Sequence, residues 1–209
     1  MDLALILSFI TATIVLAIMP GPDNIFVLTE SITNGQKNGI LISTGLSLGV
    51  IVHTTAAATG LSIIIQQSAL VFSMIKYAGA LYMFYLAYEA YKSKSIIVTI
   101  DKNHDKVETK AFYLIRKGFL MNVLNPKVSL FFIAFLPQFV SENGYHISIQ
   151  MMILGVVFML LTIIVFSLIA ILSGRLTKYV NNPRFWMITK WSKISVLSLL
   201  GLLLGLSDR

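Results

Sequence analysis

Six long apolar segments constrain the fold of this chain more than any other feature of its sequence. They cover residues 3–32, 39–66, 69–91, 112–140, 147–173 and 188–206. A helix needs about 20 apolar residues to cross the ~30 Å hydrocarbon core of a bilayer, and only helices or closed barrels satisfy their backbone in lipid. The segments lack the polar–apolar alternation of barrel strands. The sequence therefore predicts an all-α membrane protein with six transmembrane helices in one polytopic domain, residues 1–209.

The composition excludes several classes of protein. Hydrophobic residues make up 56% of the chain and charged residues only 12%, about half of the ~25% that is usual in soluble domains. A soluble enzyme is therefore excluded. The chain has no cysteine, which excludes thiolate catalysis and cysteine-ligated metals. His53, His104 and His146 are far apart, and no Walker A sequence occurs. We therefore expect no enzyme activity, no metal, no cofactor and no ATP-driven motor.

The basic residues predict the orientation of the spans. Cytoplasmic loops are enriched in lysine and arginine, and thirteen of the 16 basic residues lie in or beside the loops after the first, third and fifth segments. They are Lys37, Lys92, Lys94, Lys102, Lys106, Lys110, Arg116, Lys117, Arg175, Lys178, Arg184, Lys190 and Lys193. We therefore expect the basic loop 92–111 in the cytoplasm and both termini outside. Lys190 and Lys193, near the start of the sixth segment, can snorkel to the interface. The net charge of +7 is thus a topology signal, and nucleic acid is not an expected partner.

The first and fourth segments are broken in corresponding places. Each has about 30 residues with a proline near its middle, and an offset of 106 positions places Pro20 on Pro126. A straight helix of that length would be about 45 Å long, more than the bilayer core requires. With three spans per half, the sequence predicts a 3+3 inverted repeat of residues 1–91 and 112–209, joined by the basic loop. Matched broken helices in such folds meet near the midplane and carry the substrate site. Two ordinary proline kinks are the alternative.

The first break, Pro20-Gly21-Pro22-Asp23, offers groups that can bind a cation. Its two prolines remove backbone donors, so that upstream carbonyls are left free, and its glycine permits a sharp bend. The freed carbonyls are candidate ligands for an ammonium group. Asp23 has two interpretations, which are compatible. It can cap the helix that follows, or it can be an intramembrane carboxylate that binds a cation or a proton.

The second break, Asn125-Pro126-Lys127, is the counterpart of the first. Its proline frees upstream carbonyls, including that of Asn122, and it places Lys127 near the bilayer centre, where an unpaired charge is costly. The partner of Lys127 could be Asp23 or the carboxylate of a substrate. The alternative is a structural ion pair that fastens the two broken helices together. Asn122 and Asn125 could add neutral hydrogen bonds to a substrate.

Two further polar residues lie inside predicted spans. His53 shares a small-residue face with Gly45 and Gly49, which favours close packing against a neighbouring helix. It could relay protons, because histidine titrates near neutral pH, or it could simply be hydrogen-bonded. Lys76 lies near the outer end of the third segment, where it could snorkel or line a transport pathway.

A series of short motifs runs in order along nearly the whole chain. It comprises Met19-Pro20-Gly21-Pro22-Asp23, Gly35, Gly39, Gly45, Gly49, His53, Gly60-Leu61, Lys76-Tyr77-Ala78-Gly79-Ala80, Tyr82, Gly118-Phe119, Asn122, Asn125-Pro126-Lys127, Phe131-Phe132 and Leu136-Pro137-Gln138-Phe139. In this series the chain resembles the LysE/RhtB family of amino-acid exporters. The resemblance implies export of amino acids or related metabolites through the bacterial inner membrane by proton exchange. The forms of the two breaks are more similar to the homoserine/threonine/leucine branch than to the basic-amino-acid branch.

We therefore expect a secondary active exporter of neutral amino acids, such as threonine, homoserine or leucine, that exchanges substrate for protons. Asp23 and Lys127 would flank the zwitterion, with Pro20, Gly21, Asn122 and Asn125 around it, and Asp23 or His53 would carry the coupling proton. The alternatives are a passive channel, since paired broken helices also line pores, and a cation exporter of related fold. The expected partners are an amino acid, protons and the lipid bilayer. A homodimer is possible through the small-residue faces at Gly45/Gly49 and Gly201/Gly205.

Overall fold

The computed structural model describes residues 2–62, 68–93, 110–141, 144–180 and 182–207, and the elements in these ranges are all helical. The first half contains α1 (Leu3–Ile18), α2 (Pro22–Thr33), α3 (Gln36–Ala56), a π-helical turn η1 (Ala57–Leu61) and α5 (Ala69–Lys92). The second half contains α6 (Ala111–Val123), α7 (Pro126–Leu130), the turns η2 (Phe131–Phe135) and η3 (Leu136–Phe139), α8 (Ile147–Val180) and α9 (Pro183–Leu206). The predicted all-α fold is confirmed.

The described helices provide six membrane spans when each broken pair is counted as one. Four single spans, residues 36–61, 69–92, 147–177 and 183–206, are long and apolar enough to cross a bilayer. The other two are bent pairs: α1 meets α2 at 58°, and α6 meets the segment Pro126–Phe139 at 49°. The last two spans begin or end beyond the apolar segments of the sequence, because their terminal turns contain basic residues that remain helical.

The breaks follow from the restriction that a proline places on the residue before it. Met19, Gly21 and Asn125 each precede a proline, and each has an extended ψ angle, of 122°, 179° and 110° respectively. A proline ring disfavours helical geometry at the preceding residue, so α1 ends before Pro20 and α6 ends before Pro126. Proline then begins the next helix, where its missing N–H removes no helical hydrogen bond. The positions of both breaks are thus encoded locally.

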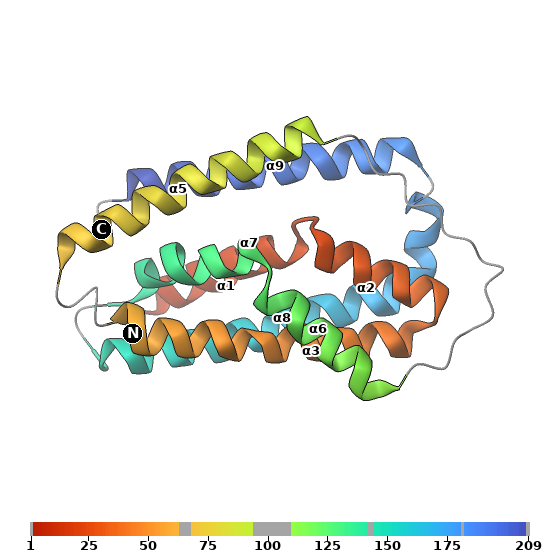
Figure 1. Cartoon of the computed structure of the whole chain (residues 1–209), viewed down its shortest axis with the longest axis horizontal. Coiled ribbons are helices and arrows are strands. Elements are labelled where there is room, and N and C mark those ends of the chain that lie inside the picture. The colour runs from red at the N-terminus through yellow and green to blue at the C-terminus, as the bar shows by residue number, and fades with distance from the viewer. Residues whose placement is uncertain (1, 63–67, 94–109, 142–143, 181, 208–209) are drawn as a thin grey trace.

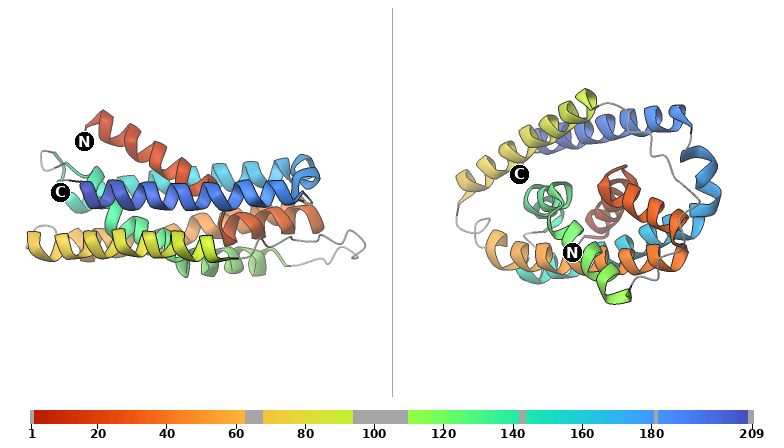
Figure 2. Two further views of the ribbon diagram at one scale, coloured as in Figure 1. Left: turned by 90° about the horizontal axis from the view of Figure 1, so that it is seen from above. Right: turned by 45° about the vertical axis from the view of Figure 1, so that its right-hand side comes forward.

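The two halves run in opposite directions through the molecule. In Figure 1, α1 and α2 lead from the end that holds both termini to the opposite end, whereas α6 and α7 lead back. The third spans of the two halves, α5 and α9, pack side by side and antiparallel on one flank. The beginning of α1 and the end of α9 lie at the same end of the molecule in both views (Figures 1 and 2). This arrangement is that of the predicted inverted repeat.

Small residues allow α3 and α6 to pack closely. A Cβ atom added at Gly45 would collide with the backbone of Ile115, and one at Gly118 would collide with the carbonyl group of Ile42. The Gly45 face of α3 therefore has its partner within the chain, as small-residue faces in membrane helices commonly do. Gly201 likewise faces α5, where its nearest neighbours include Phe84.

Phenylalanine side chains fill the core between the breaks and the end of the molecule that holds the termini. Phe131 is central: its ring lies 5.9 Å from that of Phe9, 5.4 Å from that of Phe158 and 5.7 Å from that of Phe135, centroid to centroid. These rings come from α1, η2 and α8 and are almost completely buried. We refer to Phe9, Phe131, Phe135 and Phe158 as the aromatic cluster.

Candidate functional site

The two breaks meet in the core of the molecule. The side-chain amide of Asn125 donates a 2.5 Å hydrogen bond to the carboxylate of Asp23. The ammonium group of Lys127 donates to the carbonyl oxygens of Leu16 (3.0 Å) and Met19 (3.3 Å), at the end of α1. The predicted approach of the two breaks is therefore confirmed. Side chains of the second break form hydrogen bonds with the backbone and the carboxylate of the first.

Asn125 joins the helix cap of one break to the carboxylate of the other. Its Oδ1 accepts the backbone N–H of Lys127 at 3.0 Å and so caps α7. Because a backbone N–H can only donate, the oxygen of the amide must face α7, and its Nδ2 is left to face Asp23. The cap of α7 therefore determines that Asn125 presents a hydrogen-bond donor to Asp23. An aspartate at position 125 would keep the cap and lose this donor.

The carbonyl groups freed by the first break are bound by the chain itself. The carbonyl oxygens of Leu16 and Met19 accept hydrogen bonds from the ammonium group of Lys127. The carbonyl oxygen of Ala17 accepts a hydrogen bond of 2.7 Å from the side-chain amide of Asn24. The sequence suggested these carbonyls as ligands for the ammonium group of a substrate. In this structure the ammonium group of Lys127 takes that position instead. A buried helix end needs such partners, because an unpaired carbonyl in the membrane core is costly.

Asp23 is positioned as a buried carboxylate rather than as a helix cap. The N-cap of α2 is Gly21, and no side chain caps this helix. Asp23 is 3% exposed and is the only buried carboxylate among the described residues. Its side chain faces Asn125. The interpretation of Asp23 as an N-cap is therefore wrong, and the carboxylate is free for another role.

A small chamber with four polar residues in its otherwise apolar lining lies beside Asp23. Its lining includes Asp23, Asn122, Lys127, Phe158 and Thr162. Its volume of about 10 Å³ is near the minimum for one water molecule. The Oδ1 atom of Asn122 and the Oγ1 atom of Thr162 are fully buried and have no hydrogen-bond partner within the described chain. Two residues that line a chamber with a carboxylate thus carry polar atoms without partners, and such atoms can bind a water molecule.

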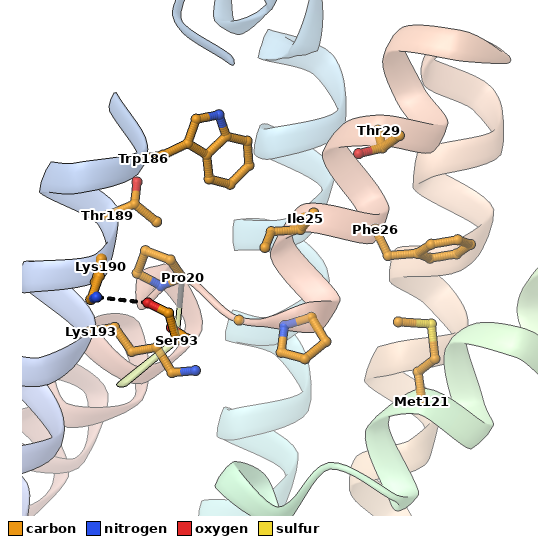
Figure 3. Close-up of a pocket in the computed structure, with 12 residues that line it drawn as sticks. Pro20, Ile25, Phe26, Thr29, Ser93, Met121, Trp186, Thr189, Lys190 and Lys193 are labelled. Carbon is orange, nitrogen blue, oxygen red and sulfur yellow. Dashed lines mark hydrogen bonds between the residues drawn. The ribbon is translucent and has the colours of Figure 1, made fainter. Parts of the chain in front are cut away.

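A much larger cavity lies between α2 and α9 (Figure 3). It has a volume of about 560 Å³. It is lined by Pro20, Gly21, Pro22, Ile25, Phe26, Thr29, Ser93, Met121, Trp186, Thr189, Lys190 and Lys193. Pro20 and Gly21 thus border the large cavity, whereas Asp23, Asn122 and Lys127 border the chamber. Five of the six residues that the sequence grouped into one site are thus divided between two compartments, and Asn125 lines neither.

His53 packs against a neighbouring helix, as predicted. Its Nε2 lies 3.2 Å from the carbonyl oxygen of Asn122 on α6, and its ring lies 5.6 Å from that of Phe132. It therefore contacts the backbone of a chamber residue. Lys76 lies elsewhere: it is 5% exposed, and its ammonium group donates to the carbonyl oxygen of Ser207 at 2.7 Å. This bond joins α5 to the end of α9, and Lys76 lines neither compartment.

Three site residues were missed by sequence reasoning. Thr162 is one of the few polar residues in a very apolar segment, which also contains Ser167 and Ser173, so the sequence does not single it out. Asn24 directly follows Asp23, so its bond to a freed carbonyl could have been expected. Lys193 was interpreted as an interfacial residue, but it lines the large cavity. Its position depends on the rotation of α9, which the sequence pattern does not specify.

These features define a multi-pass α-helical membrane protein with two broken helices that meet around a buried carboxylate. Residues 14–207 match the family described as LysE type translocator. The chain therefore belongs to the LysE family, whose members are transporters.

Similar proteins extend over nearly the same length. The uncharacterized membrane protein YrhP of Bacillus subtilis (strain 168) is 30% identical over 94% of this chain and 95% of its own. Leucine efflux proteins of Enterobacter sp. (strain 638) and Salmonella choleraesuis (strain SC-B67) are 24% and 25% identical, over 85% and 94% of this chain and 83% and 89% of their own. No solved structure matches the chain.

Proposed function

We propose that this protein exports neutral amino acids across the bacterial inner membrane in exchange for protons. Its family is one of translocators, and similar proteins are leucine efflux proteins. The single observation that carries the proposal is the contact of the large cavity with the first break, beside the chamber that contains Asp23. A substrate compartment thereby adjoins a group that can carry a proton.

The large cavity suits a small molecule with an apolar side chain. Its volume of about 560 Å³ lies within the ~300–1,000 Å³ usual for small-molecule sites. Ile25, Phe26, Met121 and Trp186 supply apolar lining, and Lys190 and Lys193 supply positive charge. An amino acid such as leucine offers matching groups, an apolar side chain and a carboxylate.

Coupling to protons is assigned to Asp23. Exchange of a proton for a zwitterion requires a group that is protonated in one state and ionised in another. Asp23 is the one buried carboxylate of the described residues, and it directly follows Pro22, which lines the cavity. When Asp23 is ionised, its negative charge favours the ammonium group of Lys127 in the same chamber. Protonation of Asp23 removes that attraction and weakens the contact of Lys127 with α1. The proton on Asp23 can thereby control how firmly the two broken helices are held together.

The aromatic cluster favours an exporter over a passive channel. The rings of Phe9, Phe131, Phe135 and Phe158 pack together in the core. Three of them come from α1 and η2, which lie between the breaks and the end of the molecule that holds both termini (Figure 1). The large cavity lies toward the other end, where Thr29, Ser93 and Trp186 line it. A cavity on one side of the breaks and packed aromatic rings on the other side are in keeping with alternating access around a central site.

The proposal is tested with everted membrane vesicles from cells that produce the protein. Such vesicles, acidified inside by respiration, should accumulate radiolabelled leucine, threonine or homoserine above the outside concentration, and a protonophore should abolish the accumulation. Vesicles without the protein are the control. Fast equilibration that is indifferent to the protonophore would identify a channel, and no flux of any of the three would contradict the proposed substrate class.

A further inference from the structure

We propose that Lys193 binds the carboxylate of the transported amino acid in the large cavity. This inference rests on the proposed function and deepens it, because it assigns the subsite that recognises the substrate. Lys193 lies ten residues after Pro183, the first residue of α9, and so about 15 Å along the helix from its start. It is partly buried, and Figure 3 shows it with Lys190 on the α9 side of the cavity, across from α2.

Lys193 differs from the neighbouring lysines because it has no hydrogen-bond partner in the described part of the chain. Lys190 also lines the cavity, but its ammonium group donates to the carbonyl oxygen of Ser93 at 2.7 Å. Lys127 donates to two carbonyl oxygens at the end of α1. Lysine without a counter-charge is costly inside a membrane. An ammonium group that faces a cavity there is suited to an anionic ligand.

The opposite wall of the cavity is also favourable to an anion. Gly21 and Pro22 line it at the N-terminus of α2, a helix of 12 residues. No side chain caps this helix, so its first N–H groups and its positive dipole end face the region of the break. Asp23 lies in the first turn of α2, but its negative charge is offset by the ammonium group of Lys127, which lines the same chamber. A carboxylate between Lys193 and α2 would meet positive potential from both sides.

The apolar lining of the cavity favours an amino acid with an apolar side chain over small polar anions. Ile25, Phe26, Met121 and Trp186 line the same cavity, so a carboxylate held by Lys193 places the remainder of the ligand among apolar side chains. A lipid headgroup that reaches Lys193 from the membrane would supply a similar negative group. The experiment below separates these two sources of the anion.

The test compares L-leucine with L-leucine amide, which lacks the carboxylate. Purified protein is reconstituted in phosphatidylcholine vesicles, and both compounds compete for uptake of radiolabelled leucine. We expect the wild-type protein to prefer leucine over the amide by tenfold or more, in line with the strength of a charge-assisted hydrogen bond. In Lys193→Met this preference should fall to about twofold. Lys193→Arg should keep most of it. Arg184→Met removes an exposed charge from the same helix and should leave the preference unchanged.

The preference for leucine over leucine amide is a ratio that is measured within each variant. It therefore does not depend on the amount of folded protein in the vesicles. Wild-type protein that transports leucine, together with an undiminished preference in Lys193→Met, would overturn the assignment of Lys193 and leave the proposed function standing. Absence of leucine transport by the wild-type protein would overturn both. A loss of preference seen only when phosphatidylglycerol is added to the vesicles would assign Lys193 to lipid binding instead.

Discussion

At the scale of single residues, the core of this protein depends on side chains that each form two hydrogen bonds to buried groups. Asn125 caps α7 with its oxygen and donates to Asp23 with its nitrogen. Lys127 supplies hydrogen bonds to two carbonyl groups that the first break leaves without helical partners. Such groups are expensive to replace, since each substitution leaves at least one buried polar atom without a partner.

We expect Asp23→Asn to abolish uphill transport. Asparagine keeps nearly the same volume but cannot exchange a proton, so leucine in everted vesicles should equilibrate and not accumulate. The measurement is the ratio of inside to outside leucine, with the amount of inserted protein measured by immunoblot. Full proton-dependent accumulation by this variant would remove Asp23 from the coupling mechanism and favour His53, which contacts the carbonyl oxygen of Asn122.

Asn125→Asp should destabilise the protein, and a second substitution at Asp23 should reverse the effect. The new carboxylate keeps the cap of α7 but faces Asp23, and two adjacent carboxylates cannot both be ionised without repulsion. We expect a loss of about 1–3 kcal/mol in the free energy of unfolding, measured as a fall in the unfolding temperature in detergent.

The double variant Asp23→Asn/Asn125→Asp restores one amide and one carboxylate and should recover most of that loss. Asn125→Ser, which keeps a capping oxygen and removes the contact with Asp23, is the matched control. Equal unfolding temperatures for the single and double variants would show that the two side chains do not interact.

At the scale of helices, local sequence decides where each element begins and ends, and packing decides which faces meet. The extended conformations of Met19, Gly21 and Asn125 follow from the prolines that come next. The close contact of α3 with α6 depends instead on small residues that come together only in the folded protein, such as Gly45 and Gly118.

We expect Gly118→Ala to destabilise the protein and Gly174→Ala not to. A Cβ atom at Gly118 would collide with the backbone of Ile42, whereas Gly174 on α8 has open space around it. The first substitution should cost about 1–3 kcal/mol by overpacking, and the second should be neutral or should stabilise by up to about 1 kcal/mol through helix propensity. Unfolding temperatures of the two purified variants are compared, and a similar change in both would contradict close packing of α3 on α6.

At the scale of the whole molecule, the orientation in the membrane decides from which side the large cavity is reached. The beginning of α1 and the end of α9 share one end of the molecule, as an even number of spans requires. The large cavity lies toward the other end, and the distribution of basic residues predicts that this end is cytoplasmic. The cavity would then receive substrate from inside the cell.

Labelling of single cysteines tests this orientation directly, because the chain has no cysteine of its own. A cysteine at Ser141, beyond η3, should react with an impermeant reagent in intact cells. A cysteine at Asn103, which lies in the basic loop and outside the described residues, should react only after the membrane is opened. The reverse pattern would invert the topology and place the large cavity toward the outside of the cell, which would contradict the proposed cytoplasmic access to it.

The sequence by itself determined the class of fold, the number of spans and the two breaks. These properties are local or additive: the length of an apolar segment decides whether it can span a bilayer, and each proline restricts its own neighbour. The pseudo-symmetry of the breaks was also sufficient to predict that Asp23, Asn125 and Lys127 come together. That part of the candidate site depends on the order of the spans and not on their detailed packing.

Only the tertiary structure decided what each of these side chains contacts. Lys127 binds the carbonyl groups that were expected to receive a substrate, and Asp23 faces Asn125 instead of capping α2. Thr162 and Lys193 enter the two compartments because of how α8 and α9 are rotated about their axes. A uniformly apolar helix does not specify that rotation, since lipid and protein neighbours are equally apolar. It is set by close packing between helices and by the pairing of the few polar groups in the core.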